Sequence, residues 1–254
     1  MDGSQKLATK TSTGSSAYVG EPVFMSAITL LGISFMDEQT LLSCAESFSK
    51  LLDISYHIVL GRAGKSIAFN LTFTKYDCHH LMGIHYLLDR PDRRNRARIF
   101  DDILTSAEYR QHIATSDFWT DKVTERITCT SIIEQLIDDN HTIFRYNPSR
   151  SSFYSQIKAE YLLSNPDVII SSSDQRDIYV FLDKRADSEE RFCKSIFPKG
   201  LRDYTERQAI WTLLYKAKKH ISSGQIEVLY QHRSYSPDNN ETKSSNASTE
   251  SNGN

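Results

Sequence analysis

Three of the chain's eight histidines, His79, His80 and His85, lie within seven residues of one another. The ordinary pKa of imidazole lies near neutrality, so this cluster suggests either proton transfer or metal binding. Successive residues of a helix turn by about 100°, so His80 and His85 would diverge by roughly 140° on an intact helix and would not hold one ion together. The spacing of four with an intervening glutamate that is typical of zinc proteases is also absent. We therefore predict no metal site and interpret His85, and after it His80, as candidates for proton transfer. The alternative for His85 is a hydrogen-bonded histidine of the core.

An arginine cluster directly follows the histidines. A guanidinium group offers paired donors to phosphate oxygens, so such a cluster can follow the backbone of a nucleic acid. We expect Arg93, Arg94 and Arg96 to bind substrate in this way. The alternative is the solvated start of a helix, where these side chains form surface ion pairs with Asp89 and Asp92.

Two further basic residues lie on expected strands. Alternation in Thr142–Tyr146 places Arg145 on the face opposite the aromatic side chains, and alternation in Ser155–Leu163 places Lys158 opposite Tyr161. A Lys or Arg that projects from a sheet into a cleft stabilises negative charge that develops on phosphate. Arg145 and Lys158 are candidates for that role. The alternative is an edge-strand charge that opposes aggregation.

Ser195 and two tyrosines complete the candidate set. No histidine and acid accompany Ser195 in the sequence, so no hydrolase triad is inferred, but its hydroxyl can hydrogen-bond a phosphate oxygen. Aromatic rings stack on unpaired bases, which is the role expected of the tyrosines. The predicted catalytic residues are His85, His80, Arg145, Lys158 and Ser195, and the predicted substrate-binding residues are Tyr161, Tyr204, Arg93, Arg94 and Arg96.

The elements that must position these residues follow from hydrophobic periodicity. A first helix begins at Asp37, and a hairpin joins residues 55–60 to 66–73 through the turn at Gly61–Lys65. Gly64-Lys65-Ser66 matches the end of a phosphate loop, but Val59 stands where that loop needs glycine and a strand follows, so we reject a nucleotide site. The other expected helices are 76–88, 99–104, a short one with a capping box of Thr105 and Glu108, 118–139 and 205–220. The other expected strands are 142–146, 155–163, 168–172, 177–182, 191–197 and 225–230.

This order predicts an α+β fold, in which N-terminal and central helices precede a small, mostly antiparallel β-sheet and a C-terminal helix. Residues 1–20 and 233–254 are polar and low in complexity, so we expect two disordered tails around a single domain of residues 21–232. The four cysteines form no CxxC pair, and neither a secretory leader nor a membrane-length apolar run is present. We therefore expect a cytoplasmic protein without a membrane partner. The net charge of −2 argues against a generally basic nucleic-acid-binding surface but leaves a local basic face open.

Four segments together resemble a known family, namely Leu71–His85, Ile143–Asn147, Ile157–Leu163 and Cys193–Gln208. In order and spacing they are similar to the phage-associated barnase/EndoU/colicin/RelE-like (BECR-fold) nucleases of phages and mobile elements, from about Leu71 to Tyr230. The resemblance implies helices before a small antiparallel sheet and metal-independent cleavage of RNA. Ile196 and the pair Glu206–Arg207 depart from the family's pattern.

We expect from these residues and this resemblance a metal-independent endoribonuclease without a cofactor. It would be a toxin or effector that cleaves tRNA or another structured RNA by attack of the 2′-hydroxyl, with RNA and an immunity or regulatory protein as partners. The alternative is a non-catalytic RNA- or protein-binding module on the same fold. The sequence leaves the oligomeric state and the role of the first 70 residues open.

Overall fold

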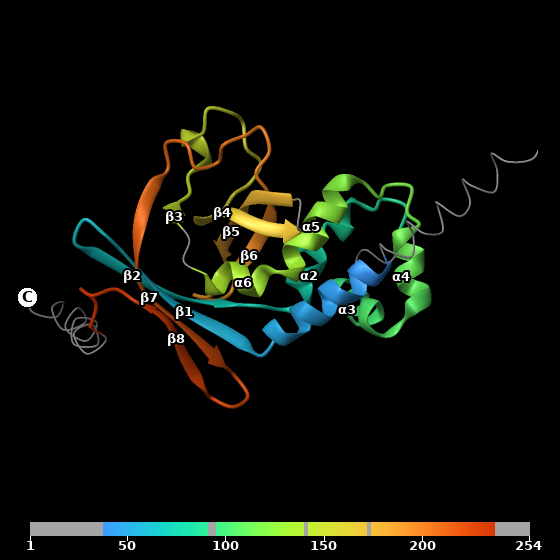
Figure 1. Cartoon of the computed structure of the whole chain (residues 1–254), viewed down its shortest axis with the longest axis horizontal. Helices are drawn as coiled ribbons and strands as arrows, with labels where there is room; N and C mark the ends of the chain where they lie inside the picture. Colours follow the sequence, from blue (N-terminus) through green and yellow to red (C-terminus); the bar gives the residue numbers. More distant parts are fainter. Residues whose placement is uncertain (1–37, 91–94, 140–141, 172–173, 237–254) are drawn as a thin grey trace, which may run out of the picture.

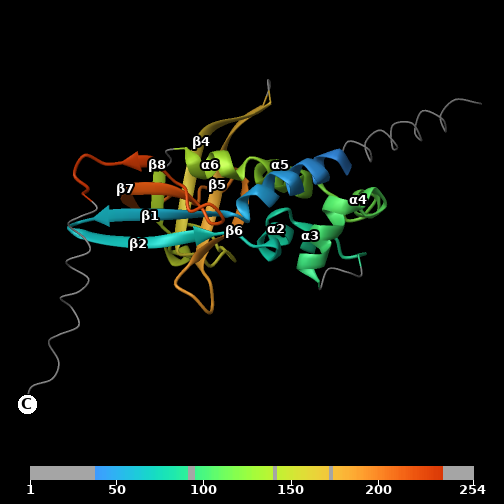
Figure 2. The ribbon, with the colours of Figure 1, turned by 90° about the horizontal axis from the view of Figure 1, so that it is seen from below.

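The computed structural model describes residues 38–90, 95–139, 142–171 and 174–236 (Figure 1). Helices occupy one side of the molecule, and strands form a barrel on the other side, as both views show (Figures 1 and 2). The predicted α+β class is confirmed. The predicted small sheet is instead a closed, mixed barrel with an extra strand, and the described part of the chain has no C-terminal helix.

Seven strands close the barrel in the order β1-β2-β6-β5-β4-β3-β7, and β7 pairs back to β1. The pairing of β2 with β6 is parallel, and the other pairings between described strands are antiparallel. The eighth strand, β8, pairs with β7 outside the ring. The strands are β1 Ile54–Arg62, β2 Lys65–Thr72, β3 Thr142–Arg145, β4 Tyr161–Ser171, β5 Asp174–Lys184, β6 Arg191–Pro198, β7 Ala209–His220 and β8 Ile226–Gln231.

A first helix spans residues 38–51, in agreement with the prediction, although its expected cap Asp37 lies outside the described residues. Helices α2 to α5 gather beside the barrel, and α6 lies against β7 (Figures 1 and 2). The labelled helices are α2 Lys75–Leu81, α3 Arg96–Thr105, α4 Ala107–Ala114, α5 Asp121–Ser131 and α6 Ile133–Asp138, with 3-10 turns η1 Ile84–Tyr86 and η3 Pro148–Arg150. No helix in the described ranges combines the length and apolarity needed to cross a bilayer.

Alternating side chains divide the core between the two faces of β3, β4 and β5. The main cluster runs from Leu41 to Leu213 and takes Val180 from β5. A smaller aromatic cluster on the other face takes the neighbouring Tyr179 and Phe181. Because a strand directs successive side chains to opposite faces, residues close in sequence end up on different sides of the barrel wall. This separation decides which predicted site residues can meet.

The predicted helix over 205–220 is wrong, because β7 occupies most of that segment. Leu213 and Ala217 fit a helical spacing, but they are also buried along a strand that pairs with β1 and β3. Lys216 and Lys218 alternate with Ala217 and reach α6, where Lys216 Nζ donates to three backbone carbonyls at 2.7–2.9 Å. Long-range pairing has overridden a local helical pattern.

Other boundaries also differ from the predictions, since the expected helix over 99–104 begins at Arg96 and the expected strand over 168–172 is part of β4. The expected helix over 118–139 breaks at Ile132 into α5 and α6. The cap of α4 is Ser106, whose hydroxyl accepts from the Tyr109 N–H at 3.1 Å, rather than the Thr105–Glu108 box. The expected strand over 155–163 begins only at Tyr161. The hairpin of β1 and β2 and the last strand, β8, are confirmed.

Candidate functional site

Helix α2 is fixed at its start by Asp77. The buried Asp77 carboxylate accepts from the Thr74 backbone N–H at 2.7 Å and from both terminal nitrogens of Arg185 at 3.2 and 2.7 Å. A bidentate Arg–carboxylate pair of this kind is strong and geometrically specific. Arg185 follows β5, so this pair fixes the start of α2, and with it His79 and His80, relative to the barrel.

The helix ends after Leu81, and Gly83 then adopts φ +78°. A residue with a Cβ disfavours this left-handed conformation, whereas glycine adopts it readily. The chain turns there and continues as η1, so the predicted helix from Tyr76 to Leu88 is wrong. The turn also removes the reason for expecting the histidines to diverge.

The three histidine rings are gathered by this turn. His80 and His85 stack with ring centroids 4.3 Å apart and planes 18° apart, and the ring of His79 lies 6.5 Å from that of His85. The ring of Tyr86 lies 4.0 Å from that of His85. The inference that His80 and His85 point apart is therefore wrong, because it assumed an intact helix. In the described ranges no group of three His, Cys, Asp or Glu side chains is arranged to hold a metal.

The pKa values of these histidines are lowered. Burial is the largest cause in each, and it lowers the pKa of His79 to about 4 and that of His85 to about 3. The charges of Arg126 and Arg96 lower the pKa of His80 and His85 further. At neutral pH all three imidazoles are thus uncharged, so they can accept a proton and cannot act as the initial donor.

Arg126 of α5 is a cation whose charge acts on His80 and His85. Its Nη2 donates to Ser195 Oγ on β6 at 3.2 Å, and its guanidinium lies 5.5 Å from the ring centroids of both Tyr86 and Phe197. Its other terminal nitrogen is buried and has no hydrogen-bond partner among the described residues. Its neighbour Glu125 is engaged by Arg176 at 2.6 Å. A partly buried guanidinium without a carboxylate is costly, and a bound anion would compensate it.

A cavity of about 820 Å³ opens beside Arg126. Its walls come from η1, α5, the segment before β4 and the loop after β6. They are rich in aromatic and basic side chains: Tyr86, Lys122, Arg126, Tyr154, Phe197, Arg202 and Tyr204 line it, together with Gln156 and Leu201. One carboxylate, Glu125, also lines it, and it is paired with Arg176. The arrangement can therefore bind an anion at Arg126, exchange a proton at the histidines and hold an aromatic group in the cavity.

The predicted site residues fall into two groups. His80, His85 and Ser195 meet at Arg126, and Tyr204 lies across the cavity with its ring 5.5 Å from that of Phe197. The charge of Arg96 lowers the pKa of all three histidines, so Arg96 belongs to the same group. Lys158 is exposed on the segment before β4, and no hydrogen bond or ion pair joins its side chain to a described histidine. Arg93 and Arg94 lie outside the described residues.

Arg145 and Tyr161 lie elsewhere, on the side of the barrel wall that faces the main core. The Arg145 guanidinium lies 4.8 Å from the Tyr161 ring centroid and pairs with Glu160 at 3.5 Å. The ring of Tyr161 stacks on that of Phe69 with centroids 5.1 Å apart, and the Arg191 guanidinium lies 5.2 Å from the centroid of the Phe69 ring. The structure does not bring Arg145 and Tyr161 to the histidines.

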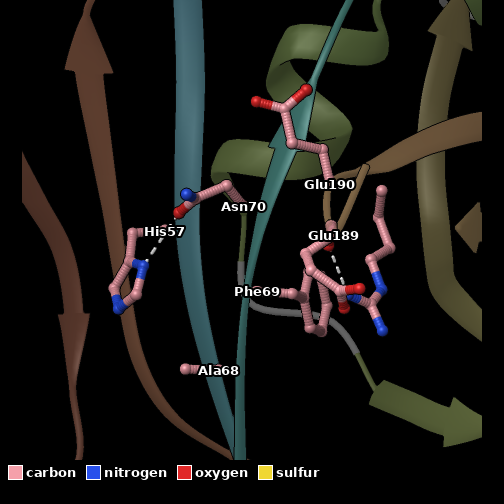
Figure 3. Close-up of a pocket in the computed structure, with 7 residues that line it drawn as sticks. His57, Ala68, Phe69, Asn70, Glu189 and Glu190 are labelled. Atoms are coloured by element: carbon pink, nitrogen blue, oxygen red, sulfur yellow. Dashed lines mark hydrogen bonds between the residues drawn. The ribbon is translucent and has the colours of Figure 1, made fainter. Parts of the chain in front are cut away.

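That stack borders a second hollow, of about 330 Å³ (Figure 3). His57 Nδ1 and Asn70 Oδ1 lie 2.9 Å apart at one wall, and Glu189 and Glu190 stand at another (Figure 3). The guanidinium of Arg191, which also lines it, is already paired with Glu160 at 2.9 Å. Two carboxylates and no unpaired cation among its described walls make this hollow less suited to an anion than the one at Arg126.

Sequence reasoning missed Arg126, Tyr86 and Tyr154. The signal available for Arg126 was its place on α5 between the buried Val123 and Ile127, where a charged residue interrupts the apolar face. The place of Tyr86 beside His85 depends on the turn at Gly83, and hydrophobic periodicity did not predict that turn.

Comparison with known proteins adds one finding. The family model described as phage-Barnase-EndoU-ColicinE5/D-RelE like nuclease 4 matches residues 40–233, which is most of the chain. No curated protein and no solved structure matches the chain. The match covers every element that builds the histidine site, from α2 to the loop after β6. The chain belongs to the phage-barnase-EndoU-colicin E5/D-RelE-like nuclease family, group 4.

Proposed function

We propose that this nuclease cleaves RNA by attack of the 2′-hydroxyl on the adjacent phosphate and that Arg126 binds that phosphate. The observation that carries the proposal is the guanidinium of Arg126, which has no carboxylate partner among the described residues and lies beside Ser195, near the stacked His80 and His85. Guanidinium and hydroxyl groups match phosphate oxygens, and the same contacts stabilise the charge of the phosphorane.

In this mechanism a neutral imidazole removes the proton of the 2′-hydroxyl, and His85 is the first candidate with His80 as the second. The oxygen attacks phosphorus, the bond to the 5′ oxygen breaks, and a donor protonates the leaving oxygen. Tyr86, whose phenol lines the cavity, is the candidate donor. Each proton transfer typically contributes about 10²–10⁴-fold to the rate.

Binding of the phosphate would also make the base stronger. The free site holds the positive charges of Arg126 and Arg96 beside His85, which lower its pKa together with burial. A bound phosphate adds negative charge, favours the imidazolium form and so raises the pKa toward the pH of the reaction. The site would thus gain its base when substrate arrives.

The test is incubation of purified protein with single-stranded RNA in EDTA, since the proposed mechanism assigns proton removal and charge stabilisation to side chains and uses no metal ion. We expect cleavage that falls at least about 100-fold in His85→Ala. If Lys158 contacts a flanking phosphate, as we propose, Lys158→Ala should chiefly weaken the binding of RNA and reduce the salt dependence of that binding. Absence of cleavage, or cleavage that His85→Ala leaves unchanged, would reject the proposal.

A binding module without turnover is the second candidate. It is favoured by the low pKa of the histidines and by the buried, unpartnered ring nitrogens of His79 and His85. It predicts that RNA is retained but not cleaved, and that histidine substitutions change retention little.

We further propose, on family membership, that the protein is a toxin or effector of phage or mobile-element origin that acts on tRNA or another structured RNA and is restrained by an immunity or regulatory protein. Expression should then arrest growth, and His85→Ala should relieve the arrest at an equal protein level. Equal growth with both proteins would contradict a toxin role.

A further inference from the structure

Exposed apolar side chains gather around the cavity at Arg126. Tyr154 is 81% exposed, Tyr86 is 44% exposed, and Leu201 is fully exposed. Single exposed apolar residues are normal on a protein surface, but three around one cavity form a patch that indicates a binding site. All three line the same 820 Å³ space, which falls within the range of small-ligand sites.

The deeper wall of this cavity is an aromatic platform. The rings of Tyr204 and Phe197 lie 5.5 Å apart, and Tyr204 also packs edge-on against Phe181 at 5.3 Å and Phe153 at 5.0 Å. These contacts, with the buried aromatic cluster behind them, hold the platform in place. The packed rings of Phe197 and Tyr204 and the exposed Tyr154 line the same cavity, and such aromatic faces suit a flat aromatic ligand.

Polar groups of the cavity are free to contact such a ligand. Gln156 and Lys122 form no hydrogen bond or ion pair with another described residue, and the Arg202 guanidinium contacts only the Phe153 ring, at 5.3 Å. An amide both donates and accepts, so Gln156 can bond the edge of a base. Lys122 and Arg202 supply positive charge for neighbouring phosphates.

We propose that this cavity binds an unpaired nucleobase next to the phosphate held by Arg126, so that the substrate is a single-stranded segment of RNA. In a duplex both faces of each base are covered by its neighbours, and only an unpaired base can enter and stack. This inference rests on the proposed function for its phosphate, while its base site is built from Tyr154, Phe197, Tyr204 and Gln156.

Binding of DNA separates the base site from cleavage, because DNA lacks the attacking 2′-hydroxyl. The probe is a fluorescein-labelled 12-nucleotide deoxyoligomer of mixed sequence, single-stranded or annealed to its complement, with anisotropy as the readout. We expect the full-length protein to bind the single strand at least about tenfold more tightly than the duplex. Tyr154→Ala should weaken single-strand binding about 5- to 100-fold, and Tyr154→Phe should retain it.

Tyr76→Ala is the matched control, since Tyr76 is a tyrosine 59% exposed that does not line the cavity. Equal binding of single strand and duplex, or equal loss in the Tyr76 and Tyr154 alanine variants, would overturn the base site even if RNA is cleaved. Tyr154-dependent binding of single-stranded DNA without any cleavage of RNA would uphold the base site and reject the nuclease mechanism.

Discussion

At the scale of single residues, the chain holds two arginines in different electrostatic situations. Arg110 is buried with its charge compensated, because it pairs with Glu38 at 3.2 Å and donates to the Ile103 carbonyl at 2.9 Å, although its Nε has no partner among the described residues. Arg126 has the Ser195 hydroxyl and two aromatic rings but no carboxylate among the described residues. Arg110 therefore serves the fold, whereas Arg126 is available to a ligand.

Methionine at each position should separate these roles. We expect Arg126→Met to reduce cleavage about 10²–10³-fold, because a donor to the developing charge is lost. Its free energy of unfolding should stay within about 1 kcal/mol of the parent, because no ion pair is broken. Arg110→Met should lose about 2–4 kcal/mol, because it removes a buried guanidinium that donates to the Ile103 carbonyl and leaves the partly buried Glu38 without its cation. Urea unfolding measures the stability of the two variants, and cleavage rates measure their activity. Equal destabilisation by the two variants would contradict the separate roles of Arg110 and Arg126.

The histidine pKa values predict the pH dependence of the reaction. A base must be neutral to act, so the rate falls as the pH drops below its pKa. For kcat/KM, which reports the free enzyme, the acid limb should lie below about pH 5, because the pKa of His85 is about 3. For kcat, which reports the complex, the limb should lie at higher pH, because bound phosphate raises the pKa. Acid limbs of kcat/KM and kcat that coincide near the ordinary pKa of histidine, about 6.5, would contradict this account.

At the scale of elements, the turn between α2 and η1 assembles the site. Gly83 has φ +78°, and a Cβ there would lie 3.0 Å from Arg126 Cδ and 3.2 Å from Tyr86 Cδ2. Gly64 in the β1–β2 turn has nearly the same conformation, φ +77°, but open space around it. The two glycines thus share a left-handed conformation that alanine would adopt only with strain, and they differ in what an added Cβ would meet.

Alanine at these glycines tests the turn. Both variants should lose about 1–2 kcal/mol of stability from the left-handed conformation. Only Gly83→Ala should also reduce cleavage, by at least about tenfold, because it displaces Arg126 and Tyr86 from the histidines. Thermal unfolding and cleavage assays compare them. Equal activity of the two variants would show that the turn does not position the site.

The same turn explains how far sequence reasoning could go. Periodicity identified the β1–β2 hairpin and the helix over residues 38–51, because both depend on local patterns. It treated α2 as continuous, because one glycine inside a helical pattern is often tolerated. The stacking of the two histidines followed from a backbone angle that no spacing rule contains.

At the scale of the whole molecule, barrel closure depends on β7. Ile54 pairs with His220 and Phe144 pairs with Ile210, so one strand joins segments from opposite ends of the fold. Such pairings are decided by packing between distant segments, and local propensity predicted a helix there instead. The sequence likewise grouped Arg145 and Tyr161 with the histidines, although these two residues contact each other, Glu160 and Phe69 instead.

Lys216 joins this strand to the helical part of the molecule. Its buried Nζ donates to the carbonyls of Ile137, Asp138 and Asp139 at the end of α6, where unpaired carbonyls otherwise accumulate. Burial lowers its pKa to about 8, so the amine is still mostly charged at pH 7. We expect Lys216→Met to lower the free energy of unfolding by about 2–4 kcal/mol. Lys219→Met, at an exposed position of the same strand, should change it by less than about 0.5 kcal/mol, and equal effects would contradict this role.

The chemistry of the product ends tests the central claim most directly. A single-stranded RNA oligomer is incubated in EDTA with the full-length protein, and the masses of the fragments are determined by mass spectrometry. Attack by the 2′-hydroxyl predicts a 2′,3′-cyclic phosphate on one fragment and a 5′-hydroxyl on the other. It also predicts that a 2′-deoxy residue at the cleaved position blocks the cut and that Arg126→Met nearly abolishes both products. Fragments with 5′-phosphate and 3′-hydroxyl ends, or cleavage at the deoxy position, would contradict it.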